Sequence, residues 1–112
     1  MKEIKPDVVV DVRFYATSEG GRQEPTTDRH FSCPFRSEGE LFDCLLLLEK
    51  KTGPIRPGQR VVVPIKFLRP RVIKDTLSTG QRFQLWDMRP FAEGQIIEVC
   101  GDTEGQVLQS DI

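Results

Sequence analysis

The stretch PDVVVDVRFY, residues 6–15, alternates apolar side chains with side chains of mixed polarity. Every second residue is apolar: Val8, Val10, Val12 and Phe14. Asp11 and Arg13 occupy positions between them. Because successive side chains of a strand point to opposite faces, this period of two predicts a β-strand with one buried face.

The same period recurs further along the chain. It covers residues 61–67 and 83–86, and GQIIEV at 94–99 predicts a last short strand. An aromatic, β-prone stretch begins near Phe31. Glycine-containing turn signals separate these runs: SEGG, KTGP, RPGQ, STGQ and AEGQ. Short strands with frequent turns predict an all-β fold.

Two features of the sequence, a leucine-rich run and two prolines, need to be placed within this pattern of strands. The run ELFDCLLLLEKK, residues 40–51, suits a short helix by propensity or a buried strand by its apolar character. The strands predicted on either side favour the strand. Pro64 and Pro70 cannot donate a ladder hydrogen bond, so we expect them at an edge, a bulge or a strand end.

Length and composition predict one soluble domain in the cytoplasm. A chain of 112 residues with a net charge of −1 can bury one core, so we expect a single domain over residues 1–112. We expect its core at about 7–100 and a frayed tail at 101–112. No stretch reaches the roughly 18 apolar residues of a membrane span, and the first residues do not resemble a signal peptide. We therefore expect no membrane partner.

The cysteines and the lone histidine do not form a recognisable reactive site. Cys33, Cys44 and Cys100 are an odd number without a CxxC pair, which disfavours a disulfide framework and a zinc site. His30 precedes Cys33 by three residues, and positions three apart on a strand face opposite sides, so we do not expect an activated thiol. We predict no catalytic residue, no metal and no cofactor. Cys44 is expected to be buried, and Cys100 to be accessible.

A locally basic stripe lies between residues 56 and 74. Its cations, with no acid among them, are Arg56, Arg60, Lys66, Arg69, Arg71 and Lys74. The stripe can be a solvated strand face, or it can be a phosphate-binding surface. The first interpretation is favoured because no aromatic side chains alternate with the cations as they do in nucleic-acid-binding proteins.

Four short motifs, in the same order and with nearly the same spacing, resemble the C-terminal domain of bacterial elongation factor Tu. They are EGGRxxP at 19–25, an aromatic strand ending in FR at 35–36, PGQRVVVPIKFLRP at 57–70 and GQRF at 80–83. The resemblance covers roughly residues 7–100. It implies a closed six-stranded antiparallel Greek-key barrel in which the leucine run is a strand.

The resemblance also implies a docking face. In the family, this barrel follows a GTPase domain and another β-barrel, whereas residues 1–112 hold neither, nor a GxxxxGK[ST] loop for a nucleotide. The family's EGGR loop and GLRF strand pack against the GTPase domain. The equivalent positions here are Gly20, Gly21, Arg22, Arg82, Gln84 and Asp87. Alternatively, Gly20 and Gly21 only turn the chain between two strands.

A second surface of the family contacts the T-stem backbone of transfer RNA. Arg69 matches the basic residue before the second proline of that surface, and Arg71 follows it. Ser32 replaces a glutamine, and MRPFAEG at 88–94 replaces the family's GGRTVGAG segment. These departures weaken the expectation of transfer-RNA binding.

Two functions of different classes follow from the sequence. The first is a non-catalytic module that binds an unidentified protein through the Gly20–Arg22 loop and the Arg82–Asp87 strand, as a mimic of the translation factor or a neutraliser of a toxin that targets it. The alternative is an RNA-binding barrel that uses the Arg56–Lys74 stripe, with Ser32, Arg69 and Arg71 in its surface. An enzyme is the least favoured class, since no paired carboxylates, triad or metal spacing stands out.

Overall fold

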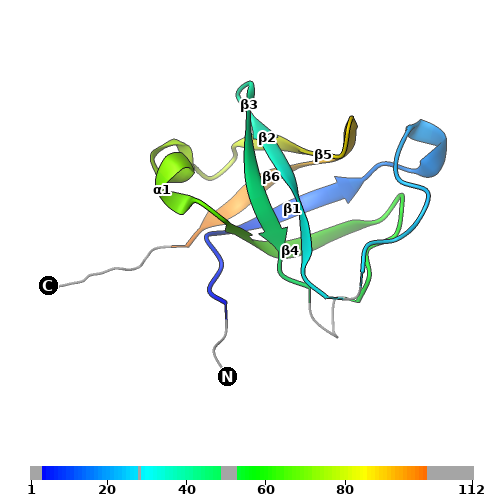
Figure 1. Ribbon diagram of the computed structural model, residues 1–112, viewed down its shortest axis with the longest axis horizontal. Helices are drawn as coiled ribbons and strands as arrows, with labels where there is room; N and C mark the ends of the chain where they lie inside the picture. The colour runs from blue at the N-terminus through cyan, green and yellow to red at the C-terminus, as the bar shows by residue number, and fades with distance from the viewer. Residues whose placement is uncertain (1–3, 28, 49–52, 101–112) are drawn as a thin grey trace, which may run out of the picture.

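The structure is a computed structural model that describes residues 4–27, 29–48 and 53–100 (Figure 1). Its strands are β1 (Val8–Phe14), β2 (Phe31–Ser37), β3 (Glu40–Leu46), β4 (Arg60–Phe67), β5 (Arg82–Trp86) and β6 (Pro90–Val99). They close into a barrel in the order β1-β4-β3-β2-β5-β6, and every pair is antiparallel. The prediction of an all-β fold with a closed six-stranded antiparallel barrel is confirmed.

The strand order has a Greek-key arrangement. Strands β2, β3 and β4 are sequential neighbours, whereas β1 lies beside β4, so the connection from β1 to β2 must cross the barrel. This connection is the long polar loop that contains EGGR. It includes a short 3₁₀ helix, η1 (Thr17–Glu19). The loop therefore has a structural role, which is to carry the chain over one end of the barrel.

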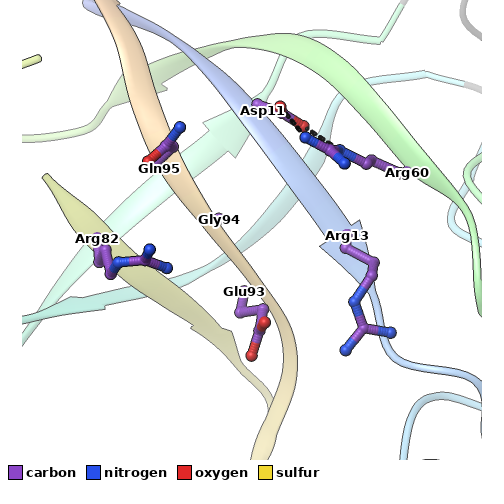
Figure 2. Close-up of a pocket in the computed structure, with 7 residues that line it drawn as sticks. All are labelled: Asp11, Arg13, Arg60, Arg82, Glu93, Gly94 and Gln95. Atoms are coloured by element: carbon purple, nitrogen blue, oxygen red, sulfur yellow. Dashed lines mark hydrogen bonds and ion pairs between the residues drawn. The ribbon is translucent and has the colours of Figure 1, made fainter. Parts of the chain in front are cut away.

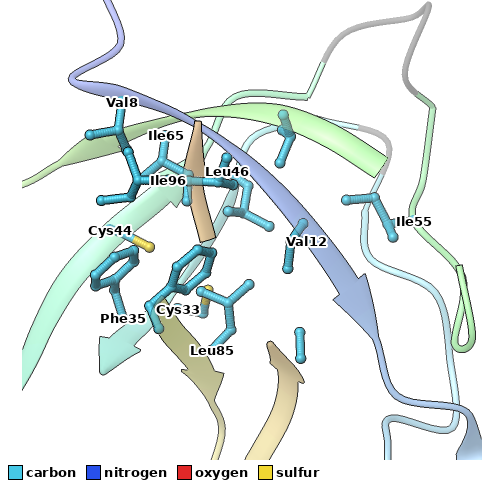
Figure 3. Close-up of a cluster of buried hydrophobic side chains, with 14 of the residues drawn as sticks. Val8, Val12, Cys33, Phe35, Cys44, Leu46, Ile55, Ile65, Leu85 and Ile96 are labelled. Carbon is cyan, nitrogen blue, oxygen red and sulfur yellow. The ribbon is translucent and has the colours of Figure 1, made fainter. Parts of the chain in front are cut away.

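The alternating pattern places the apolar side chains inside. Val8, Val10 and Val12 are fully buried, and the leucine run continues β3 with Leu46 at 0% exposure. The interior is a single cluster of apolar side chains from all six strands (Figure 3). Phe35 lies at its centre, where its ring stacks on Phe83 with centroids 4.5 Å apart and meets Phe67 edge-on at 4.9 Å.

Loops cover the two ends of the barrel. At the end where β1 finishes, Ile55 is fully buried, and its N–H donates to the hydroxyl of the buried Thr26 at 2.9 Å. The opposite end carries the short helix α1 (Pro70–Ile73) and the 3₁₀ helix η2 (Lys74–Thr76), with Ile73 fully buried. At both ends, residues of the connections thus extend the core beyond the strands.

Helix α1 was not predicted. Pro70 begins it at the first helical turn, a position at which a missing N–H breaks no intrahelical bond. Pro64 lies inside β4, and its carbonyl oxygen accepts from the N–H of Leu47, one residue beyond the end of β3, at 2.9 Å. Pro64 therefore lies in the middle of a strand and not, as was expected, at a strand end. Its missing N–H is tolerated because the β3–β4 pairs end at Ile65, the residue beside it.

The prediction of a turn at AEGQ is wrong. Gly94 lies inside β6, which begins at Pro90 instead of at residue 94. A β-carbon at Gly94 would overlap the carbonyl oxygen of Asp11 and lie 2.9 Å from Cα of Val12. The glycine is therefore required by the close approach of β6 to β1, and a turn has no part in it.

A tight turn that was not predicted joins β2 to β3. Ser37 and Glu40 form the last cross-strand pair, and Glu38 and Gly39 between them have positive φ angles of 53° and 82°. Two consecutive positive φ values are typical of a type I′ hairpin turn. Part of the KTGP signal and the whole 101–112 tail lie outside the described residues.

Candidate functional site

The Gly20–Gly21 pair has two separate structural reasons. Gly20 ends η1 with a left-handed φ of 93°, a conformation that glycine adopts without strain. Gly21 is buried, and a β-carbon there would overlap the carbonyl oxygen of Tyr15. Both glycines therefore serve the path of the crossing loop.

Arg22 connects this loop to the turn between β5 and β6. Its guanidinium carbon lies 4.8 Å from the ring centroid of Phe31 and 5.6 Å from that of Phe91. One guanidinium nitrogen, Nη1, lies 3.7 Å from Oδ2 of Asp87. Stacking leaves the Arg22 side chain only 24% exposed. The structure thus brings together two residues that the sequence placed in one docking face.

A chain of side-chain hydrogen bonds runs across the outside of β5, β1 and β6. The indole N–H of Trp86 donates to Oε1 of Gln84 at 3.4 Å, and Nε2 of Gln84 donates to the Tyr15 hydroxyl at 3.5 Å. The Tyr15 hydroxyl donates to Oε1 of Glu93 at 3.0 Å. Partial burial raises the pKa of Tyr15, which keeps this hydroxyl protonated as a donor. All the bonds therefore point from Trp86 towards Glu93.

Arginine side chains flank this chain on both sides. Arg36 lies over the ring of Trp86 at 4.9 Å, and Arg13 lies over the ring of Tyr15 at 5.3 Å. Strand pairing places Arg13 opposite Glu93, Glu93 opposite Gln84, and Gln84 opposite Arg36. We call the surface formed by Arg13, Tyr15, Arg36, Gln84, Trp86 and Glu93 the aromatic–arginine face.

A hollow that is lined in part by Gly94 adjoins this face (Figure 2). It measures about 260 Å³ and is lined by charged side chains from β1, β4, β5 and β6. Arg82 lies at its edge and also lines a second hollow that reaches Arg36. On the far side, Arg60 binds Asp11 through two hydrogen bonds. Arg82 therefore borders the aromatic–arginine face at the opposite end of β5 from Asp87.

Of the predicted docking residues, Gln84 lies within the aromatic–arginine face, whereas the Gly20–Arg22 loop, Asp87 and Arg82 lie at its borders. Trp86 is half buried, and the guanidinium of Arg36 lies over its ring. In the sequence, Arg36 stands out only as the end of an aromatic motif. Its alternation with buried Phe35 could have placed it outside, but its partners come from strand pairing, which no local pattern reveals.

Of the residues expected to bind RNA, Ser32 lies on β2 opposite Leu45, whose partner on the other side is Lys66 of β4. Arg69 and Arg71 lie at α1, which follows the end of β4. Within the rest of the basic stripe, Lys66 is ion-paired with Asp7 at 3.2 Å. Arg60 is also ion-paired, with Asp11. Part of the positive charge of the stripe is therefore neutralised along β4.

Cys44 is buried, as expected, whereas Cys100 is only partly accessible. Cys33 and Cys44 face each other across β2 and β3, with both side chains in the core, and Cys100 is partly exposed (Figure 3). His30 is exposed in the segment before β2. Among residues 4–27, 29–48 and 53–100, no three His, Cys, Asp or Glu side chains gather as a metal site would require. In the same ranges, no helix is long and apolar enough to cross a membrane.

No family model matches the chain, and no curated protein matches it. The resemblance to elongation factor Tu therefore stays a prediction from the sequence motifs.

Proposed function

We propose that this chain is a non-catalytic protein-binding module that receives its partner on the aromatic–arginine face. The observation that carries the proposal is the stacking of Arg36 on Trp86, in the same cross-strand row as Arg13. Tryptophan, tyrosine and arginine are the residues that contribute most binding energy in protein interfaces. Here they gather on one side of the barrel.

The face is ordered before any partner arrives. Arg13 and Arg36 are held over aromatic rings, and Gln84 and Glu93 are held by hydrogen bonds. Side chains that are already fixed lose less rotamer freedom on binding, so more of the contact energy contributes to affinity. The Gly20–Arg22 loop with Asp87 forms one border of the face, and Arg82 forms another.

The motifs shared with elongation factor Tu support a partner from bacterial translation, met in the cytoplasm. In that family, the equivalent loop and strand pack against a GTPase domain. A mimic that competes for such a domain and a protein that neutralises a toxin aimed at the factor would both use this face.

Capture of partners from a ribonuclease-treated bacterial lysate tests the proposal. Wild-type protein, Arg36→Glu and the matched charge reversal Arg56→Glu are compared by quantitative mass spectrometry. Arg56 is exposed in the loop before β4 and is not a member of the aromatic–arginine face. We expect a set of proteins that Arg36→Glu loses and Arg56→Glu keeps.

Circular dichroism melts establish that both variants are folded before the comparison. Identical protein sets for all three chains would contradict the proposed face. A set of proteins lost only on ribonuclease treatment would contradict protein binding and favour the RNA-binding barrel.

A further inference from the structure

A second hollow of a different character lies at the opposite end of the barrel. It is formed where α1 and η2 lie beside the start of β1 and the end of β6 (Figure 1). It measures about 380 Å³, within the range of small-molecule pockets. Its lining residues are Asp7, Pro70, Arg71, Lys74, Leu77, Val99 and Cys100.

The walls of this α1 hollow are mainly apolar. Pro70, Leu77 and Val99 contribute hydrocarbon surface, and Leu77 also packs on the barrel core. The hollow is more enclosed than the two beside Gly94, whose linings are mainly polar. An apolar group bound here would be removed from water on several sides. This burial of apolar surface is the main source of affinity for small ligands.

The charged groups that line the α1 hollow differ in whether other groups of the protein already bind them. The carboxylate of Asp7 is occupied, since it accepts from the N–H of Phe67 at 2.8 Å and pairs with Lys66 at 3.2 Å. Arg71 and Lys74 are exposed, and within the described part of the chain neither forms an ion pair. They are three residues apart across consecutive helical turns, a spacing that places side chains on the same side.

Cys100 adds no charge to the hollow. Burial, together with the nearby carboxylates of Glu98 and Asp7, raises the pKa of its thiol, so it is neutral under ordinary conditions. The available charge of the hollow is therefore positive and comes from the two cations at its rim.

We propose that the α1 hollow binds a small aliphatic monocarboxylate. Its hydrocarbon body would lie against Pro70, Leu77 and Val99, and its carboxylate would reach Arg71 and Lys74. The α1 hollow is separate from the aromatic–arginine face, so ligand binding in the hollow can be tested independently of the proposed function.

Cys100 provides a direct report of occupancy, because a ligand in the hollow shields its thiol. The alkylation rate of Cys100 by iodoacetamide, a neutral reagent, is followed by mass spectrometry at constant pH with increasing hexanoate or 1-hexanol. We expect both to slow alkylation, with hexanoate half-protective at about a tenfold lower concentration because of its charge-assisted hydrogen bonds.

Paired variants test the role of the cations. In Arg71→Gln/Lys74→Gln, the advantage of hexanoate over 1-hexanol should disappear while protection by the alcohol remains. The matched variant Arg29→Gln/Arg89→Gln changes two exposed cations outside the hollow and should retain the advantage. Retention of the advantage in the first variant would overturn the assignment.

Two further results would overturn the proposal. One is alkylation of Cys100 that neither hexanoate nor 1-hexanol slows. The other is stronger protection by N-acetyl-leucine than by hexanoate, which would assign the hollow to the C-terminus of a peptide.

Discussion

Arg60 and Asp11 form a two-pronged ion pair on the outside of neighbouring strands. Nε of Arg60 donates to Oδ1 of Asp11 at 2.9 Å, and Nη2 donates to Oδ2 at 2.7 Å. The pair joins the start of β4 to the middle of β1, beside the hollow over Gly94. Its parallel hydrogen bonds are the strongest form of contact between an arginine and a carboxylate.

This pair predicts a pH dependence of stability. The hydrogen bond from Arg60 lowers the pKa of Asp11 below its ordinary value, which is about 3.9 in an unfolded chain. A lowered pKa in the folded state stabilises the fold above about pH 4, and this stabilisation is lost as the pH falls through the lowered value. Asp11→Asn should therefore reduce the free energy of unfolding at neutral pH, and in urea titrations this reduction should shrink progressively as the pH falls below about 4.

Asp75→Asn is the control for this titration. Asp75 is an exposed carboxylate on η2, and the described residues give it no ion pair. An equal pH dependence of the two variants would show that the Asp11–Arg60 pair contributes nothing specific.

Gly94 should tolerate no side chain. In Gly94→Ala, the methyl group meets the backbone of β1 and lies 3.0 Å from the Phe83 ring, so β6 must separate from β1. We expect a loss of about 3 kcal/mol in the free energy of unfolding. Gly80→Ala is the control, because Gly80 has a positive φ of 90° but open space around it, and should cost about 1 kcal/mol. A Gly94→Ala variant no less stable than Gly80→Ala would contradict the close approach of the strands.

The contact between β2 and β5 should depend on Phe35. The backbone register between these strands contains two residue pairs, and one of them is Phe35 with Leu85. The Phe35 ring also stacks on Phe83 of β5. Phe35→Ala should therefore cost about 4 kcal/mol, measured by urea unfolding. Phe31→Ala removes a partly exposed ring near the rim and should cost clearly less; equal losses would argue against the central position of Phe35.

The thiols should differ in reactivity. A hydrogen bond with Cys33, together with burial, raises the pKa of Cys44, which is fully buried. We expect iodoacetamide to label Cys100 readily, Cys33 slowly and Cys44 only after denaturation, as read by peptide mass spectrometry. Rapid labelling of Cys33 near neutral pH that His30→Ala abolishes would indicate an activated thiolate and would contradict a non-catalytic module.

The sequence by itself determined which side chains face inward. The period of two in residues 8–14 and 61–67 depends only on the geometry of an extended backbone, so it correctly identified buried Val10 and Ile65. The leucine run was ambiguous by local pattern alone. The strands predicted on either side of it correctly favoured a strand over a helix.

Only the tertiary structure decided which strands meet and in what register. Arg36 lies beside Gln84 and Glu93 because β2 pairs with β5 and β5 with β6, and these contacts join residues far apart in the chain. The pairing of β6 with β1 requires a glycine at 94, where local composition suggested a turn. Strand pairing depends on the closure of the whole barrel, so the aromatic–arginine face and the α1 hollow exist only once the sheet has closed.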